Sequence, residues 1–167
     1  MFSIGEHVIH PGQGVCTVTG FDEDAPTPMI ILECKQGHAK TRMMYPLAQS
    51  NRLHLAISRE EAENLIEHYC DLECDPFTEG NSSLEETHFK QLLKEGAPET
   101  VRVAKTMHHR IRLAERQAKK PSSYYARVLK EARRRSLEEL SVAIGCSEED
   151  IEQRLSAAES AIDASLN

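Results

Sequence analysis

The N-terminal stretch Phe2–Val18, FSIGEHVIHPGQGVCTV, decides how the fold begins. Residues 8–9 are β-branched and apolar, which favours a strand. The Pro-Gly-x-Gly of residues 11–14 then ends this strand, because proline holds φ at about −65° and cannot donate a backbone hydrogen bond. Gly12 and Gly14 can adopt the positive φ values that a tight reversal requires. A second strand follows, so the stretch predicts the opening β-hairpin of a small sheet.

Further strand-forming segments alternate with turn residues over the next part of the chain: residues 28–34, 41–46 and 53–57. At Ser58 the apolar period changes from that of a strand to that of a helix. Ser58-x-x-Glu61 also has the pattern of a capping box. We therefore expect an α+β chain, with a β module over residues 1–57 and an all-helical module over residues 58–167.

Five helical patterns fill the second module, separated by segments rich in Pro, Gly and Ser. A second Ser-x-x-Glu, which begins at Ser83, predicts the start of the second helix. Pro98 suits the first turn of the third helix, and Gly145 suits the end of the fourth. Ser147 is the expected N-cap of the fifth.

The order of these parts resembles the CarD/CdnL family of bacterial transcription regulators. The similarity includes the signature IGEHVIHPGQGV at residues 4–15, and the segments HFK at 88–90 and RVLKEAR at 127–133. The resemblance implies a Tudor-like β-barrel module that docks on the RNA polymerase β subunit. It also implies a helical module that touches promoter DNA at the upstream edge of the transcription bubble.

The same resemblance implies that an edge strand of the β module extends a sheet of the polymerase. We place it in the fourth strand segment, and expect these polymerase-binding residues: Thr41, Arg42, Met43, Met44 and Pro46. The chain departs from the family here, because a basic strand residue of the family falls at Met44. Arg42 lies two residues earlier and therefore on the same strand face.

The formal net charge is −7, which does not by itself favour DNA binding. Residues 88–135, however, contain 14 basic and 4 acidic residues. Most of these bases therefore lack an acid four positions away on the same helix. Phosphate is one source of counter-charge, and the acidic remainder of the chain is the other. The expected contacts to DNA, which would be non-specific or read its shape, are Leu84, Lys90, Lys119, Lys120, Arg127, Lys130 and Arg134.

Family members commonly carry a tryptophan just before the aromatic-Lys segment, and it is thought to wedge into the minor groove. This chain contains no Trp. The corresponding position falls on Glu85. The negative phosphates of DNA would repel its carboxylate. Either the neighbouring Leu84 acts as a smaller wedge, or the wedge function is absent.

Other classes of function have little support in the sequence. The five cysteines are odd in number and scattered, which argues against a disulfide framework and for a reducing cytoplasm. His68, Cys70 and Cys74 lack the second ligand pair of a structural zinc site, so we expect no metal or cofactor. No catalytic motif, signal peptide or apolar membrane span is present. We expect a cytoplasmic, nucleoid-associated monomer that is not an enzyme. The alternatives are a polymerase-binding adaptor without DNA contact, and a thiol or metal sensor using Cys70 and Cys74.

Overall fold

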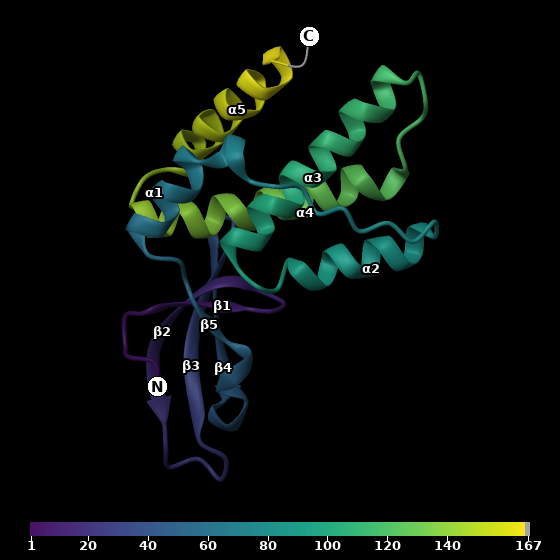
Figure 1. Ribbon diagram of the computed structural model, residues 1–167. Coiled ribbons are helices and arrows are strands. Elements are labelled where there is room, and N and C mark those ends of the chain that lie inside the picture. Colours follow the sequence, from purple (N-terminus) through teal and green to yellow (C-terminus); the bar gives the residue numbers. More distant parts are fainter. Residues whose placement is uncertain (166–167) are drawn as a thin grey trace. The chain divides into compact units, whose positions relative to one another are not determined.

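The computed structural model describes residues 1–165, and the chain forms two compact units, Met1–Ala56 and Ile57–Asn167 (Figure 1). The first unit contains an antiparallel sheet and the second is helical, which confirms the α+β fold class. The strands are β1 (His7–His10), β2 (Gly14–Asp22), β3 (Met29–Gln36), β4 (Ala39–Pro46) and β5 (His54–Leu55), with the 3-10 helix η1 (Leu47–Arg52). The helices are α1 (Arg59–Glu67), η2 (Tyr69–Asp71), α2 (Ser82–Leu92), α3 (Ala97–Arg116), α4 (Ser123–Ile144) and α5 (Glu148–Ser165). None of the helices within residues 1–165 combines the length and the apolar character needed to cross a bilayer.

The expected hairpin joins β1 to β2, with His10 paired to Gly14. Gly14 has a φ of +78°, but Gly12 does not adopt a positive φ, so that part of the expectation is wrong. The turn closes on a side chain instead: Nδ1 of His10 accepts hydrogen bonds from the backbone N–H groups of Gly12 and Gln13, both at 3.0 Å. A turn closed in this way needs only one glycine in the left-handed region.

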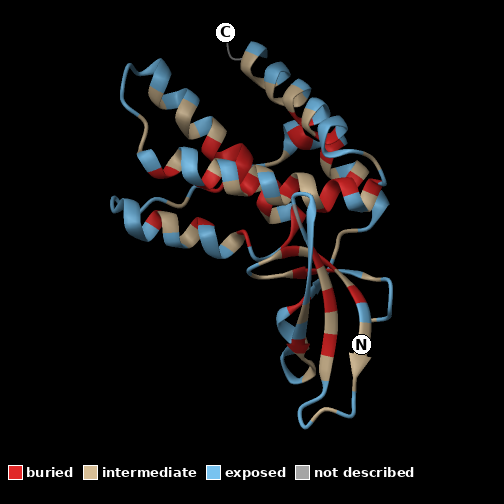
Figure 2. Cartoon of the chain, turned by 180° about the vertical axis from the view of Figure 1, so that it is seen from behind, coloured by how far each residue is buried: buried red, intermediate tan, exposed pale blue. Residues whose placement is uncertain are grey.

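All five strands form one sheet in the order β4-β3-β2-β1-β5. Alternate residues of the long strands point to one face and build the core of this unit, as the alternation of buried and half-buried residues along β3 shows (Figure 2). This core consists of Val8, Cys16, Val18, Ile30, Leu32, Cys34, Tyr45 and Leu53. The order leaves β4 at one edge of the sheet and β5 at the other.

Cys16 and Cys34 form a disulfide within this core, although the number and scatter of the cysteines argue against a disulfide framework. They lie 18 residues apart in the sequence, but the antiparallel register places them opposite each other on β2 and β3, with a Cα–Cα distance of 4.2 Å. Counting cysteines misses such a pair, because only the register brings the two thiols together. The free cysteines are Cys70, Cys74 and Cys146.

The helical unit is built around the α3–α4 pair, whose facing sides carry many of its buried residues (Figure 2). One core joins α1, η2 and α5 to this pair: Ala62, Ile66, Tyr69, Ala97, Val101, Leu140, Ile144, Ile151 and Leu155. A second core joins α2 to the same pair: Phe89, Leu93, Val103, Ala104, Met107, Tyr124, Val128 and Ala132. The apolar period of 3.6 residues accounts for both.

The helix ends agree with the sequence in most cases. Ser58 and Glu61 form the expected capping box of α1, and Gly145 ends α4 in the left-handed conformation. The expected cap of α2 is wrong. Asn81, not Ser83, caps this helix, and its side chain accepts hydrogen bonds from the N–H groups of Ser83 and Leu84. Both residue types are good N-caps, so the sequence alone does not choose between them.

Candidate functional site

The expected polymerase-binding strand is β4, and it lies at the edge of the sheet, paired with β3 on one side. An edge strand presents unpaired backbone N–H and C=O groups to which another strand can bind. Thr41, Arg42 and Met44 are exposed, and Pro46 is half-buried. Met43 instead packs against the core of the sheet, so its side chain is a structural contact.

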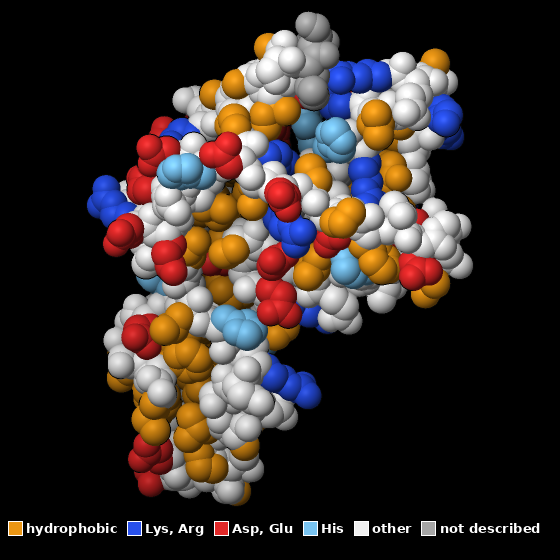
Figure 3. Space-filling view, viewed as in Figure 1, with side chains coloured by type: hydrophobic (Ala, Val, Ile, Leu, Met, Phe, Trp, Pro, Cys, Tyr) orange, Lys and Arg blue, Asp and Glu red, His pale blue; other side chains and the backbone are white. Residues whose placement is uncertain are grey.

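The face of the β3–β4 hairpin that is opposite the core is apolar toward the end of β4. Met44 is paired with Ile31, and Pro46 with Met29. The Met44 side chain is 50% exposed. Figure 3 shows hydrophobic side chains gathered over this unit, whereas acidic and basic side chains are intermixed over the helical unit. The edge strand therefore combines free backbone groups with an apolar side-chain surface.

Three of the expected DNA-binding bases form ion pairs within the helical unit. Lys90 and Arg127 both contact Glu86, at 3.0 and 3.1 Å. Arg134 contacts two acids on its own helix, Glu131 and Glu138, each at 2.7 Å. The Arg134 hydrogen bond, with a second from Arg135, lowers the pKa of Glu131 to about 2 against its burial. Arg134 is thus the most strongly neutralised of the three.

The other expected contacts are free of ion pairs within residues 1–165. Lys119 and Lys120 lie in the connection between α3 and α4, and Lys130 lies on α4. Leu84, in the first turn of α2, is 54% exposed. These four side chains can reach an external partner without first giving up an internal one.

Acidic residues of the helical unit neutralise much of the basic segment 88–135. They are one of the two sources of counter-charge that the sequence allowed, the other being phosphate. Eight of its bases form ion pairs: Lys90, Arg102, Arg110, Arg112, Arg127, Arg133, Arg134 and Arg135. Several of their partners come from other helices, such as Glu86, Glu159 and Asp163. A search for acids four residues away on one helix misses these pairs, because tertiary packing makes them.

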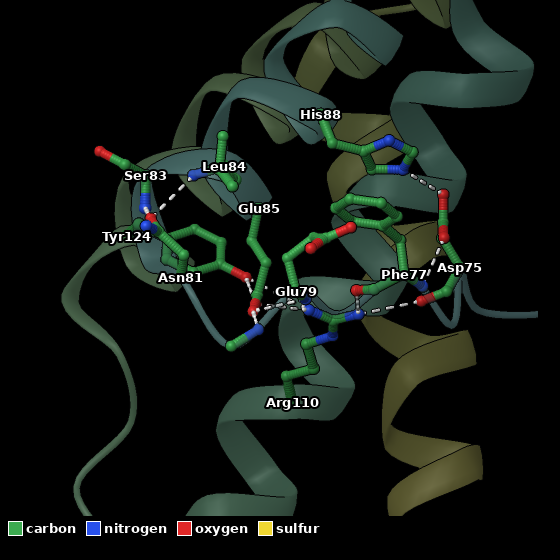
Figure 4. Close-up of polar contacts among 11 residues, drawn as sticks. Asp75, Phe77, Glu79, Asn81, Ser83, Leu84, Glu85, His88, Arg110 and Tyr124 are labelled. Atoms are coloured by element: carbon green, nitrogen blue, oxygen red, sulfur yellow. Dashed lines mark hydrogen bonds and ion pairs between the residues drawn. The ribbon is translucent and has the colours of Figure 1, made fainter.

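Glu85, which occupies the position of the family's tryptophan, does not present its carboxylate to the surface. The residue is 8% exposed and lies inside a polar network (Figure 4). Its Oε1 accepts a hydrogen bond of 2.6 Å from the Tyr124 hydroxyl, and its Oε2 accepts from the N–H groups of Glu79 and Gly80, both at 3.2 Å. Burial raises the pKa of Glu85, but these bonds outweigh it and hold the pKa below its usual value.

Arg110 on α3 ties this network to the loop that precedes α2 (Figure 4). Its guanidinium donates to the carbonyl oxygens of Asp75 and Phe77, to the Tyr124 hydroxyl and to Glu85. Its ion pair with Glu85, at 3.4 Å, is largely covered on both sides. Arg110 belongs to the basic segment 88–135, but its guanidinium makes internal contacts and is not available to DNA.

A contact between His88 and Asp75 also anchors the loop that precedes α2. Nε2 of His88 lies 3.0 Å from Oδ2 of Asp75, and the His88 ring stacks on Phe77 with centroids 3.9 Å apart. Burial raises the pKa of Asp75, but the hydrogen bonds from His88 and from the Phe77 N–H outweigh it and lower that pKa. The sequence indicated none of this network, since its members are spread over three helices and a loop.

The residues considered for a thiol or metal site do not gather into one. Within residues 1–165 no three His, Cys, Asp or Glu side chains are arranged to hold a metal ion. The backbone around Cys70 is held by Lys105, whose Nζ donates to the carbonyl oxygens of Tyr69, Cys70 and Leu72 at 2.7, 3.1 and 2.5 Å.

Comparison with protein families matches residues 2–59 to the CarD-like/TRCF RID domain. A comparison with curated proteins finds no match. The matched residues include the complete sheet with its edge strand β4, and they end at the start of α1. The match to the CarD-like/TRCF RID domain therefore covers nearly the whole N-terminal unit, and it supports a CarD-like protein.

Proposed function

We propose that this chain is an RNA polymerase-interacting CarD-like factor whose β4 strand extends a sheet of the polymerase β subunit. The observation that carries the proposal is that the matched domain contains β4 as an open edge of its sheet. Thr41, Arg42, Met44 and Pro46 would line the contact. Because Met44 is exposed and paired with Ile31, the polymerase surface facing it would be apolar as well.

The helical module would contact promoter DNA and alter the stability of the open complex. Lys119, Lys120 and Lys130 support this part, since they are basic and have no internal acid partner within residues 1–165. Of the two neighbouring residues considered for the wedge position, Leu84 is exposed and Glu85 is buried, so Leu84 would be the wedge. Lys90, Arg127 and Arg134 would contribute less, because each already contacts an acid.

Proline substitutions in the full chain test strand addition. Successive N–H groups of an antiparallel strand point to opposite sides, so those of Thr41 and Met44 point in opposite directions. One faces β3 and the other faces the open edge. Thr41→Pro and Met44→Pro should therefore differ: one destabilises the sheet, and the other leaves it folded but weakens polymerase binding. If the folded proline variant binds as well as the native chain, strand addition is wrong.

One set of observations favours a second candidate, the polymerase-binding adaptor without DNA contact. Eight bases of the segment 88–135 are already paired with acids, and Glu85 has an internal role. Binding of the native chain to forked promoter DNA over a salt series separates the two functions. Affinity that falls with salt supports DNA contact, whereas the absence of salt-dependent affinity supports the adaptor.

A further inference from the structure

Glu86 on α2 is shared by two of the bases that we place at the DNA surface. Its Oε1 lies 3.0 Å from Nζ of Lys90, one turn later in the same helix. Its Oε2 accepts a hydrogen bond of 3.1 Å from Nη2 of Arg127 on α4, and Oε1 accepts a weaker one from Nε. A single carboxylate therefore neutralises one base from each of two helices.

The three side chains differ in exposure. Those of Lys90 and Arg127 are 61% and 59% exposed, whereas that of Glu86 is 17% exposed. The bases are thus accessible to a large anionic partner, while the carboxylate between them is mostly covered. The hydrogen bonds from Arg127 and Lys90 lower the pKa of Glu86, so it is ionised at neutral pH.

We propose that Glu86 is an internal competitor of the DNA backbone, which lowers the affinity of the helical module by holding Lys90 and Arg127. A phosphate that approaches these bases must share them with an anion already in contact, and the two anions repel each other. Two attractive contacts are thereby reduced to a weak net attraction. This inference rests on the proposed DNA contact and assigns the control of its strength to one residue.

Nothing comparable holds Lys130, which lies on α4 three residues after Arg127 and has no ion pair within residues 1–165. The surface therefore contains both masked and unmasked bases. Removing the masking carboxylate should unmask two contacts without adding any positive side chain.

The test compares Glu86→Gln with a matched control, Glu63→Gln. Gln keeps the size of Glu and one acceptor oxygen, but it has no charge and its NH2 group cannot accept from a base. Glu63 on α1 pairs with Arg154 on α5, at 2.6 Å, and neither is an expected DNA contact. Both variants change the net charge equally. Affinity for forked promoter DNA is measured by fluorescence anisotropy over a salt series, and circular dichroism confirms the fold.

We expect Glu86→Gln to bind DNA about tenfold more tightly at about 0.1 M salt, and its log–log salt slope to steepen by about one to two. Glu63→Gln should change the affinity by less than about twofold. When Lys90→Ala and Arg127→Ala are added, the gain from Glu86→Gln should disappear, which a double-mutant cycle measures.

The other outcomes separate this inference from the proposed function. If the native chain binds DNA with a salt dependence and Glu86→Gln binds equally well, the inference is wrong and the DNA contact stands. If only Glu86→Gln binds, the masking is confirmed and the native chain is closer to the adaptor. If neither binds, the DNA contact fails and the inference fails with it.

Discussion

At the scale of single residues, two buried carboxylates stabilise the helical unit. Glu139 is 3% exposed, and it accepts hydrogen bonds from the N–H groups of Ala97 at 2.8 Å and Ile57 at 2.9 Å. Glu139 therefore holds the backbone at two places: at Ala97, where α3 begins, and at Ile57, where the helical unit begins. Glu85 likewise accepts hydrogen bonds from backbone N–H groups of the loop before α2, and Arg110 donates to a carbonyl oxygen of the same loop.

Removal of the Glu139 carboxylate should destabilise the helical unit. Glu139→Ala leaves two backbone N–H groups without their acceptor, and a buried donor without a partner costs about 1–3 kcal/mol. We expect the free energy of unfolding in urea to fall by about 2–4 kcal/mol. Glu131→Ala, which removes a partly exposed carboxylate, should cost less. Equal losses in the two variants would contradict the role given to Glu139.

Glu139 should also make stability depend on pH. Burial raises its pKa above the ordinary value of 4.5, against the effect of its two backbone hydrogen bonds. The folded state therefore binds this proton more tightly than the unfolded state, so its contribution to stability falls as the pH rises from 4.5 through the raised pKa. The free energy of unfolding of the native chain should decrease relative to that of Glu139→Gln over this window. A difference that stays constant with pH would argue against ionisation at this site.

Placing a tryptophan at Glu85 should damage the fold. Glu85→Trp removes one partner of a buried ion pair with Arg110 and inserts a large ring where the carboxylate meets Tyr124. We expect a loss of about 3 kcal/mol or more in urea unfolding, and no stabilisation of the promoter bubble. Glu85→Gln should lose less. A tryptophan variant that is as stable as the native chain would mean that this position faces solvent.

At the scale of elements, the first turn of α2 carries the remaining wedge candidate. Because Leu84 is exposed, Leu84→Ala should change the free energy of unfolding by no more than about 0.5 kcal/mol. If this side chain contacts the bubble edge, the lifetime of the open complex should shorten. Leu113→Ala, a change at an exposed leucine of α3, is the matched control and should leave that lifetime unchanged. Equal lifetimes for both variants would remove Leu84 from the interface.

The pairing of β2 with β3 carries the disulfide, and reduction should weaken the sheet. The cross-link encloses a loop of about 18 residues, for which the loss of entropy in the unfolded chain corresponds to about 3 kcal/mol. Dithiothreitol should therefore lower the melting temperature of the native chain, and it should not affect the Cys16→Ser/Cys34→Ser variant. Five titratable thiols in the unreduced native protein would show that the bond is absent in solution.

At the scale of the whole molecule, the division after Ala56 predicts that the helical unit folds alone. Its two cores share the α3–α4 pair, and the Ile57 N–H is bonded inside this unit, so the cut must fall before Ile57. Fragment 57–167 should show cooperative thermal unfolding by circular dichroism. Fragment 1–56 is near the lower size limit for a stable core, and we expect it to fold only when oxidised. Non-cooperative melting of fragment 57–167 would show that the units depend on each other.

The sequence by itself determined the class of the fold and most of the element boundaries. Local signals carry this information: the turn at residues 11–14, the capping box at Ser58 and the glycine at Gly145 each act on their immediate neighbours. The placement of β4 at the sheet edge also agrees with expectation, since four of the strands follow one another as antiparallel neighbours. The signature at residues 4–15 identified the domain that the family comparison then matched.

Only the tertiary structure decided which charges are available to a partner. Whether Glu85 faces DNA or Tyr124, and whether Lys90 and Arg127 are free or held by Glu86, depends on how α2 packs against α4. The disulfide likewise depends on the strand register. Such pairs join residues that are far apart in the sequence. A basic segment in the sequence therefore shows only how many positive side chains are present. How many of them are free to contact DNA depends on how the helices pack.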